Sequence, residues 1–109
     1  KKSQYQSFEK ENAIGFQYQR LLSTTVNNYH VDFVLLTLQP NASRPMVSTD
    51  ACEFKLLIKG KVEYLIGNEI FVMEEGDCLF FDATEMHNPR NIGEGEALLL
   101  VVYIFNEKQ

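Results

Sequence analysis

Cysteine and histidine are scarce in this sequence of 109 residues, which contains two of each. Cys52 and Cys78 are too few for a disulfide framework, and no positively charged start followed by an apolar stretch indicates a signal peptide. We therefore expect reduced thiols and a cytoplasmic protein. With only two histidines in the chain, the role of His87, in the stretch GDCLFFDATEMHNPRN, becomes the central question.

Basic residues are also in the minority. Lys and Arg number 10 against 15 Asp and Glu, which gives a net charge of −5 and a pI near 4.9. Nucleic-acid surfaces are built from clustered Lys and Arg, so we expect no contact with nucleic acid by this chain itself. Long apolar runs are absent too, because the longest has nine residues, at 97–105. A membrane span needs about 18, so no membrane partner is expected.

The size and composition fit one globular domain. A chain of 109 residues with 45% hydrophobic residues can form a core without disulfide bonds. Residues 1–12, KKSQYQSFEKEN, are polar, and we interpret them as an N-terminal arm or the remnant of a linker, with the domain at 13–109. Because the chain starts with Lys1 rather than Met, we expect a processed protein or a domain cut from a longer one.

Short β-prone runs separated by turn residues fill the chain from Ile14 onward, with little of the spacing that marks amphipathic helices. This pattern predicts an all-β domain, and seven or more strands indicate a sandwich or barrel. The predicted strands are residues 15–22, 31–39, 53–59, 61–66, 69–73, 78–82 and 96–105. Between two of them, Gly67-Asn68 predicts a tight hairpin, because glycine accepts a positive φ freely.

The last predicted strand, EALLLVVYIF, is apolar at nearly every position rather than at every second one. A strand of this kind is covered on both faces. One explanation is a homodimer, in which the barrel interior covers one face and a partner copy covers the other. The alternative is a strand buried entirely within its own pair of sheets. The sequence leaves both open.

Six residues stand in an order that is similar to the motifs of a known family. They are Glu53, Gly60, Gly76, Asp77, His87 and Asn91. Their order, in an all-β background and with the hairpin between them, resembles the two motifs of the cupin superfamily over roughly residues 38–105. The resemblance implies a cupin-like double-stranded β-helix, or jelly-roll, barrel.

The resemblance also implies a position for a metal. In cupins the first motif usually brings two histidines and a glutamate, and the second one more histidine, to one divalent ion inside the barrel. Three imidazoles and a carboxylate suit Fe, Mn, Ni or Zn. When Glu53 and Gly60 are laid on the first motif, Val47 and Thr49 take the two usual histidine positions. Valine has no donor atom, and a neutral threonine hydroxyl is a poor ligand.

Only Glu53 and His87 are then left of the four expected ligands. Two protein ligands hold a first-row metal weakly. We therefore favour a barrel without metal or other cofactor over one in which Glu53 and His87 bind Fe, Mn, Ni or Zn. His30 lies outside both motifs, and we interpret it as a surface residue at a strand edge, with a role as a rescuing ligand as the alternative.

On the metal-free hypothesis, the same positions form a ligand-binding pocket. Glu53 and His87 would give an apolar barrel a few polar groups, and Lys55 shares the strand parity of Glu53. Val47 and Thr49 would lie in the same pocket. For a lone lysine, however, a side chain turned to solvent at a bulge or edge is the more common outcome.

The remaining motif residues are interpreted as structural. Asn91 can satisfy backbone groups at a turn, and Gly76-Asp77 suits the turn before the strand at 78–82. No residue is assigned a catalytic role.

A closer resemblance concerns two-domain bacterial regulators. The opening GFQYQRLL and the second motif are similar to the C-terminal cupin of transcriptional regulators that carry an Xre-type helix-turn-helix domain in front. This similarity implies a dimer-forming sensor domain, which binds a small-molecule effector and reaches DNA only through an N-terminal domain outside this chain. The alternatives are a small metal-dependent oxygenase or isomerase that uses Glu53 and His87, and a purely structural dimerisation module.

Overall fold

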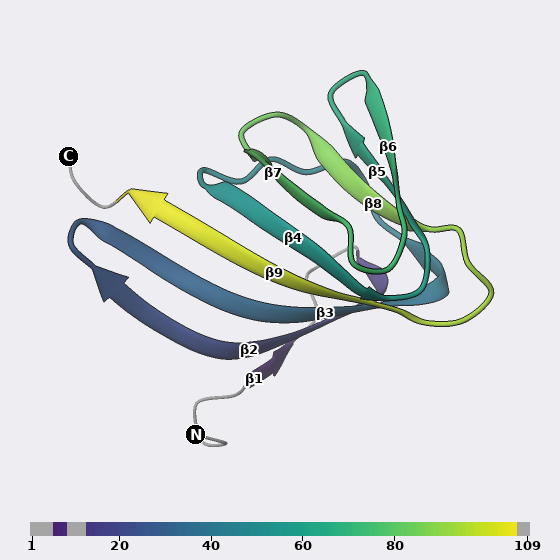
Figure 1. Ribbon diagram of the computed structural model, residues 1–109, viewed down its shortest axis with the longest axis horizontal. Coiled ribbons are helices and arrows are strands. Elements are labelled where there is room, and N and C mark those ends of the chain that lie inside the picture. The colour runs from purple at the N-terminus through teal and green to yellow at the C-terminus, as the bar shows by residue number, and fades with distance from the viewer. Residues whose placement is uncertain (1–5, 9–12, 107–109) are drawn as a thin grey trace.

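The computed structural model describes residues 6–8 and 13–106, and every regular element in these ranges is a strand (Figure 1). The strands are β1 (Gln6–Phe8), β2 (Ile14–Val26), β3 (Tyr29–Ser43), β4 (Cys52–Lys59), β5 (Val62–Ile66), β6 (Glu69–Met73), β7 (Cys78–Asp82), β8 (His87–Asn91) and β9 (Ala97–Asn106). A helix able to cross a membrane is not found among the described residues.

The strands form two antiparallel sheets that make a jelly-roll barrel. The larger sheet has the order β1-β2-β3-β9-β4-β7, and the smaller has the order β6-β5-β8. In Figure 1 the smaller sheet faces one part of the larger sheet, and the long strands β2, β3 and β9 continue past it. The all-β jelly-roll predicted from the sequence is confirmed.

Alternation along each strand sends every second side chain into the barrel. In β4, Glu53, Lys55 and Leu57 are buried, and in β9, Leu99 and Val101 are buried. Other apolar residues from both sheets complete one continuous core, which includes Phe16, Tyr18, Val34, Leu36, Leu38, Val62, Tyr64, Ile66, Met73 and Ala97. The polar pair of β4 therefore lies on the face that carries this core.

The seven predicted strands are all present, with ends that differ by a few residues. The Gly67-Asn68 hairpin is confirmed, since Ile66 pairs with Glu69 and Gly67 has a φ of +57°. Strand β8 was missed, because its sequence HNPRN is polar and contains Pro89. It lies at the edge of the smaller sheet, where a residue without an N–H is tolerated.

The N-terminal arm contributes structure that its composition does not predict. Residues 6–8 form β1 and pair with β2, so that Gln6 lies opposite Arg20. The other residues of the predicted arm, 1–5 and 9–12, lie outside the described residues.

The turn residues of the motifs have the structural roles expected of them. Asn91 Nδ2 donates to the carbonyls of Leu38 and Gly95 at 3.0 and 2.8 Å. Gly76 has a φ of +91°, and Asp77 accepts a hydrogen bond from the Glu74 amide at 2.8 Å. The side chains of Asn91 and Asp77, together with the positive φ of Gly76, therefore fix the turns on either side of the second motif.

Gly60 is the one motif glycine at which any side chain would collide with backbone. We expect Gly60→Ala to lower the free energy of unfolding by about 1–3 kcal/mol, since a residue with a Cβ is strained at positive φ. Its φ is +97°, and a Cβ there would lie 2.9 Å from Ala97 Cα. Urea denaturation measures the change. Gly95→Ala is the matched control, because nothing lies within 4 Å of a Cβ at that position; equal losses in the two variants would contradict this account.

Candidate functional site

Glu53 and Lys55 point into the barrel from neighbouring inward positions of β4. They are 1% and 2% exposed, and Glu53 Oε1 lies 2.7 Å from Lys55 Nζ. The contact is an ion pair rather than an aligned hydrogen bond, because Glu53 Oε1 has no hydrogen-bond partner of good geometry among the described residues. A lysine turned to solvent was the more common expectation for Lys55, and it is wrong here, because the strand runs regularly through this position.

Aromatic rings surround the Lys55 ammonium. Its Nζ lies 5.0 Å from the ring centre of Tyr64, 6.0 Å from that of Phe81 and 5.9 Å from that of Tyr103. The negative faces of such rings attract a cation. Together with the Glu53 carboxylate, they explain how a lysine charge can be held away from water.

His87 begins β8 and is 1% exposed. Its Nδ1 lies 2.7 Å from the carbonyl oxygen of Glu85, which can only accept, so Nδ1 carries the proton. Burial lowers the pKa of His87, although the Glu85 bond and the Glu53 charge act in the opposite direction. The ring is therefore neutral near pH 7, and its Nε2 is an acceptor that faces Glu53 Oε2 at 3.7 Å, which is too long for a hydrogen bond.

Val47 and Thr49 are placed by backbone contacts next to the second motif. The amide of Val47 bonds the carbonyl of His87 at 3.0 Å, and the reverse bond is 2.8 Å, so the two residues form an antiparallel bridge. The Thr49 amide bonds the carbonyl of Ala83 at 2.8 Å. Val47 thus lies beside His87 and Thr49 beside Ala83, and both contacts are made by the backbone.

The donor set at this position does not fit a divalent metal. Among residues 13–106, no group of three or more His, Cys, Asp or Glu side chains could hold an ion. Glu53 and His87 are two donors, and the carboxylate already faces the ammonium of Lys55. A metal held by these two residues alone would have to compete with that cation.

The sequence did not single out the tyrosines that complete the cluster. Tyr64 is fully buried on β5, and its hydroxyl has no hydrogen-bond partner among the described side chains. Burial raises the pKa of Tyr64 well above its usual value, so the hydroxyl keeps its proton. Tyr18 on β2 differs, because its hydroxyl accepts a hydrogen bond from Arg44 Nη1 at 2.6 Å. The alternation Val62, Tyr64 in KVEYLI is the signal that could have placed Tyr64 inside.

His30 belongs to a different part of the barrel. It lies on β3 between β2 and β9, so the expectation of a strand-edge residue is wrong. Its Nε2 is 2.9 Å from Ser23 Oγ and 3.0 Å from Asp32 Oδ1. His30 therefore belongs to a polar group with Ser23 and Asp32, which is separate from Glu53.

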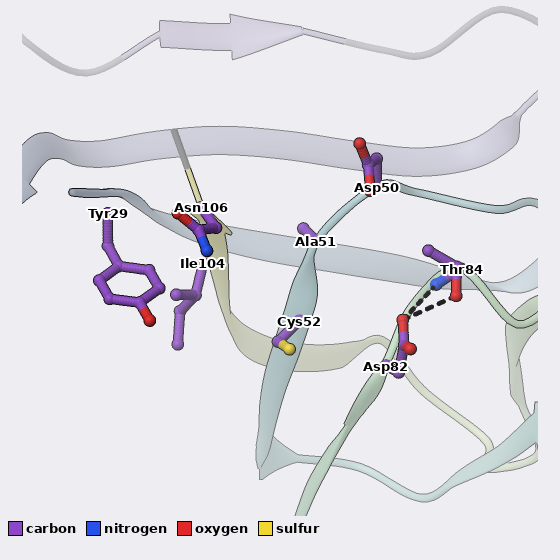
Figure 2. A pocket seen from close by; sticks show the side chains of 8 residues that line it. All are labelled: Tyr29, Asp50, Ala51, Cys52, Asp82, Thr84, Ile104 and Asn106. Atoms are coloured by element: carbon purple, nitrogen blue, oxygen red, sulfur yellow. Dashed lines mark hydrogen bonds between the residues drawn. The ribbon is translucent and has the colours of Figure 1, made fainter. Parts of the chain in front are cut away.

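A separate hollow lies on the outer face of the larger sheet, with a volume of about 390 Å³ (Figure 2). Three of the residues that line it, Cys52, Asp82 and Ile104, lie side by side on paired strands. Because Cys52 is next to the inward-facing Glu53, these residues point to the outside of the barrel. In Figure 2 the Thr84 amide and hydroxyl both bond Asp82 Oδ1. These bonds, the hydroxyl's first, lower the pKa of Asp82. The hollow therefore does not contain the motif residues.

Comparisons with known proteins agree with this architecture. The cupin domain family matches residues 34–103. A search of curated proteins finds no match. An HTH_3 family transcriptional regulator from Vibrio cholerae is similar in structure, with a TM-score of 0.72 and 12% identity over 84% of this chain. The chain spans about half of that regulator, 52% of its length.

Two further solved structures are similar over nearly the whole chain. The polyketide cyclase RemF from Streptomyces resistomycificus has a TM-score of 0.75 and 13% identity, over 100% of this chain and 84% of its own. A predicted oxalate decarboxylase from Thermotoga maritima has a TM-score of 0.71 and 18% identity, over 96% of both chains. Likeness at this identity shows the fold alone. Because the family match covers well over half of the sequence and the barrel agrees with it, the chain belongs to the cupin family.

Proposed function

We propose that this cupin is a metal-free, ligand-sensing domain of a cytoplasmic transcriptional regulator. The observation that carries the proposal is the buried polar cluster inside the barrel, above all the Tyr64 hydroxyl without a partner among the described residues. A buried polar group without a hydrogen bond costs stability. A small polar ligand that reaches the hydroxyl would recover that cost.

The cluster offers a defined set of hydrogen-bonding atoms. The Nε2 atom of neutral His87 accepts, and Glu53 Oε2 accepts beside it at 3.7 Å. The Tyr64 hydroxyl, still protonated, can donate. A matching ligand would therefore present an N–H or O–H group to His87 and Glu53 and an oxygen to Tyr64.

The regulator part of the proposal is supported by sequence and fold together. The second motif is similar to that of cupins that follow an Xre-type helix-turn-helix domain, and the Vibrio cholerae regulator shares the fold. Net charge of −5 leaves DNA contact to another domain. An effector in the barrel would act by binding two arrangements of the attached DNA-binding domains with different affinity.

A second candidate is a small metal-dependent enzyme. It is favoured by the proximity of Glu53 and His87 and by two structural neighbours, a polyketide cyclase and a predicted oxalate decarboxylase. Elemental analysis separates the candidates. Stoichiometric Fe, Mn, Ni or Zn that is lost in His87→Ala would favour the enzyme.

We also propose a homodimer through the outer face of the larger sheet. Its central outward positions form an outer apolar face of half-buried side chains: Phe33, Leu35, Phe54, Leu56, Leu98, Leu100, Val102 and Ile104. The smaller sheet lies on the other side of these strands, so the chain's own sheets leave this face partly open. None of the eight residues is charged, although the chain is acidic overall. A charge-free patch suits a second copy of itself better than a charged partner.

The Tyr64 hydroxyl gives the most direct test of the buried cluster. We expect Tyr64→Phe to raise the free energy of unfolding of the ligand-free protein by about 1 kcal/mol, because it removes a buried group without a partner. Tyr18→Phe is the matched control, since its hydroxyl is bonded to Arg44. That variant should lose about 1 kcal/mol in the same urea titrations. Similar losses in both would remove Tyr64 from the proposed ligand contacts.

Ligand sensing is tested by a thermal-shift screen of small polar metabolites on the unmodified chain. At about 100 times Kd, a ligand stabilises the folded state by about 2.7 kcal/mol, which raises the Tm of a domain of this size by roughly 10 °C. We expect at least one such compound, and a much smaller shift in His87→Gln and Tyr64→Phe.

His30→Gln is the control for this screen, because His30 belongs to the separate Ser23–Asp32 group and should keep the full shift. If no compound shifts the unmodified chain, a purely structural dimerisation module becomes the better description. An equal loss of the shift in His30→Gln would mean that binding does not depend on the buried cluster.

The homodimer is tested by sedimentation velocity. We expect the unmodified chain to sediment as a dimer at micromolar concentration and Leu100→Glu as a monomer, because Leu100 lies between Leu35 and Leu56 at the centre of the outer apolar face. Ile70→Glu is the control, since Ile70 is an exposed apolar residue on β6 of the smaller sheet and lies outside this face. A monomeric unmodified chain would rule the interface out.

A further inference from the structure

We propose that the Lys55 ammonium takes the place of the divalent ion in this barrel, and that this residue closes the site to metals. The inference deepens the proposed function, since it explains why the polar cluster of the sensing site stays free of metal. It concerns a residue outside the family's usual ligand set. Three observations carry it.

The first observation is the placement of Lys55 by β4. Because side chains alternate along a strand, a residue two positions after Glu53 must point to the same side. Both residues are almost completely buried, and the ammonium lies 2.7 Å from Glu53 Oε1. Lys55 therefore supplies to the carboxylate the positive charge that a bound metal would supply.

The second observation is that the ammonium is enclosed. The rings of Tyr64, Phe81 and Tyr103 lie 5.0 to 6.0 Å from Nζ. To make room for a metal, the ammonium would have to leave both these rings and its counter-ion. Removing one partner from a buried ion pair is strongly unfavourable.

The third observation is the orientation of His87. A backbone carbonyl fixes its Nδ1 proton, and Nε2 faces Glu53 Oε2 at 3.7 Å. This is how an imidazole is held when it serves as a metal ligand. The imidazole and the carboxylate thus face each other as two metal ligands would, and the positive charge beside the carboxylate is Lys55.

Two separate obstacles to metal binding follow. Val47 and Thr49 supply no strong donor, and Lys55 supplies a resident positive charge. Restoring donors alone should therefore be insufficient. A divalent ion next to an ammonium is repelled, and a single like charge a few ångströms away weakens binding by at least about tenfold even at an effective dielectric constant near 20.

The test uses variants of the 109-residue chain and Zn²⁺ in isothermal titration calorimetry. We expect Val47→His/Thr49→His to bind Zn²⁺ weakly, and the same pair combined with Lys55→Gln to bind it at least about tenfold more tightly. Adding Glu53→Gln to that triple variant should remove the gain, which assigns the ion to this site. The matched control replaces Lys55→Gln by Lys61→Gln, because Lys61 is an exposed lysine paired with Glu74.

Equal Zn²⁺ affinity with and without Lys55, or an equal gain from Lys61→Gln, would overturn the inference. Loss of Lys55 leaves Glu53 as an unpaired buried charge, so the triple variant will be less stable without metal. Circular dichroism with and without Zn²⁺ therefore accompanies the titration. Recovery of the fold by Zn²⁺ supports the inference, and a chain that stays unfolded in both conditions refutes it. The metabolite screen on the unmodified chain is a separate result, so either proposal can fail alone.

Discussion

The ion pair between Glu53 and Lys55 is the interaction on which the inside of this barrel depends. Each charge alone would cost several kcal/mol to bury, so neither side chain could point inward without the other. Their 2.7 Å contact lies within β4, and it is buried only in the register that places both side chains inside the barrel. A slip by one residue would move both charges to the outer face and bring Phe54 inside. The chemistry of the site therefore depends on the register in which β4 pairs with β7 and β9.

The rest of the cluster is organised around that pair. Phe81 and Tyr64 enclose the ammonium, and Phe81 also meets the ring of His87 edge-on, with centroids 5.2 Å apart. These aromatic contacts reduce the freedom of His87, whose Nδ1 is already held by a backbone carbonyl. The cluster is therefore a rigid set of polar atoms in an apolar barrel. Rigid atoms of this kind suit recognition of one ligand shape.

Much of the fold could be predicted from the sequence. Of the candidate site, Glu53 and His87 could be predicted, whereas the tyrosines around them could not. Period-2 patterns and the Gly67-Asn68 turn are local signals, so strands and hairpin followed from them. The inward direction of Lys55 did not follow from them, because a lone lysine is usually exposed and the rings around its ammonium come from three other strands. Strand β8 was hidden by Pro89, which is tolerated only at a sheet edge, and edges are set by topology.

Stability alone does not explain the polarity of this core. Replacing a buried ion pair by apolar residues of similar volume is often neutral or stabilising. A phenylalanine in place of Tyr64 would likewise fill the same space without a buried hydroxyl that lacks a partner among the described residues. Neither feature is needed to fill the core, and the two belong to neighbouring side chains, since the Lys55 ammonium lies 5.0 Å from the centre of the Tyr64 ring. Such features concentrate at functional sites, which is the physical reason to look for the function inside the barrel rather than in the hollow on its outer face.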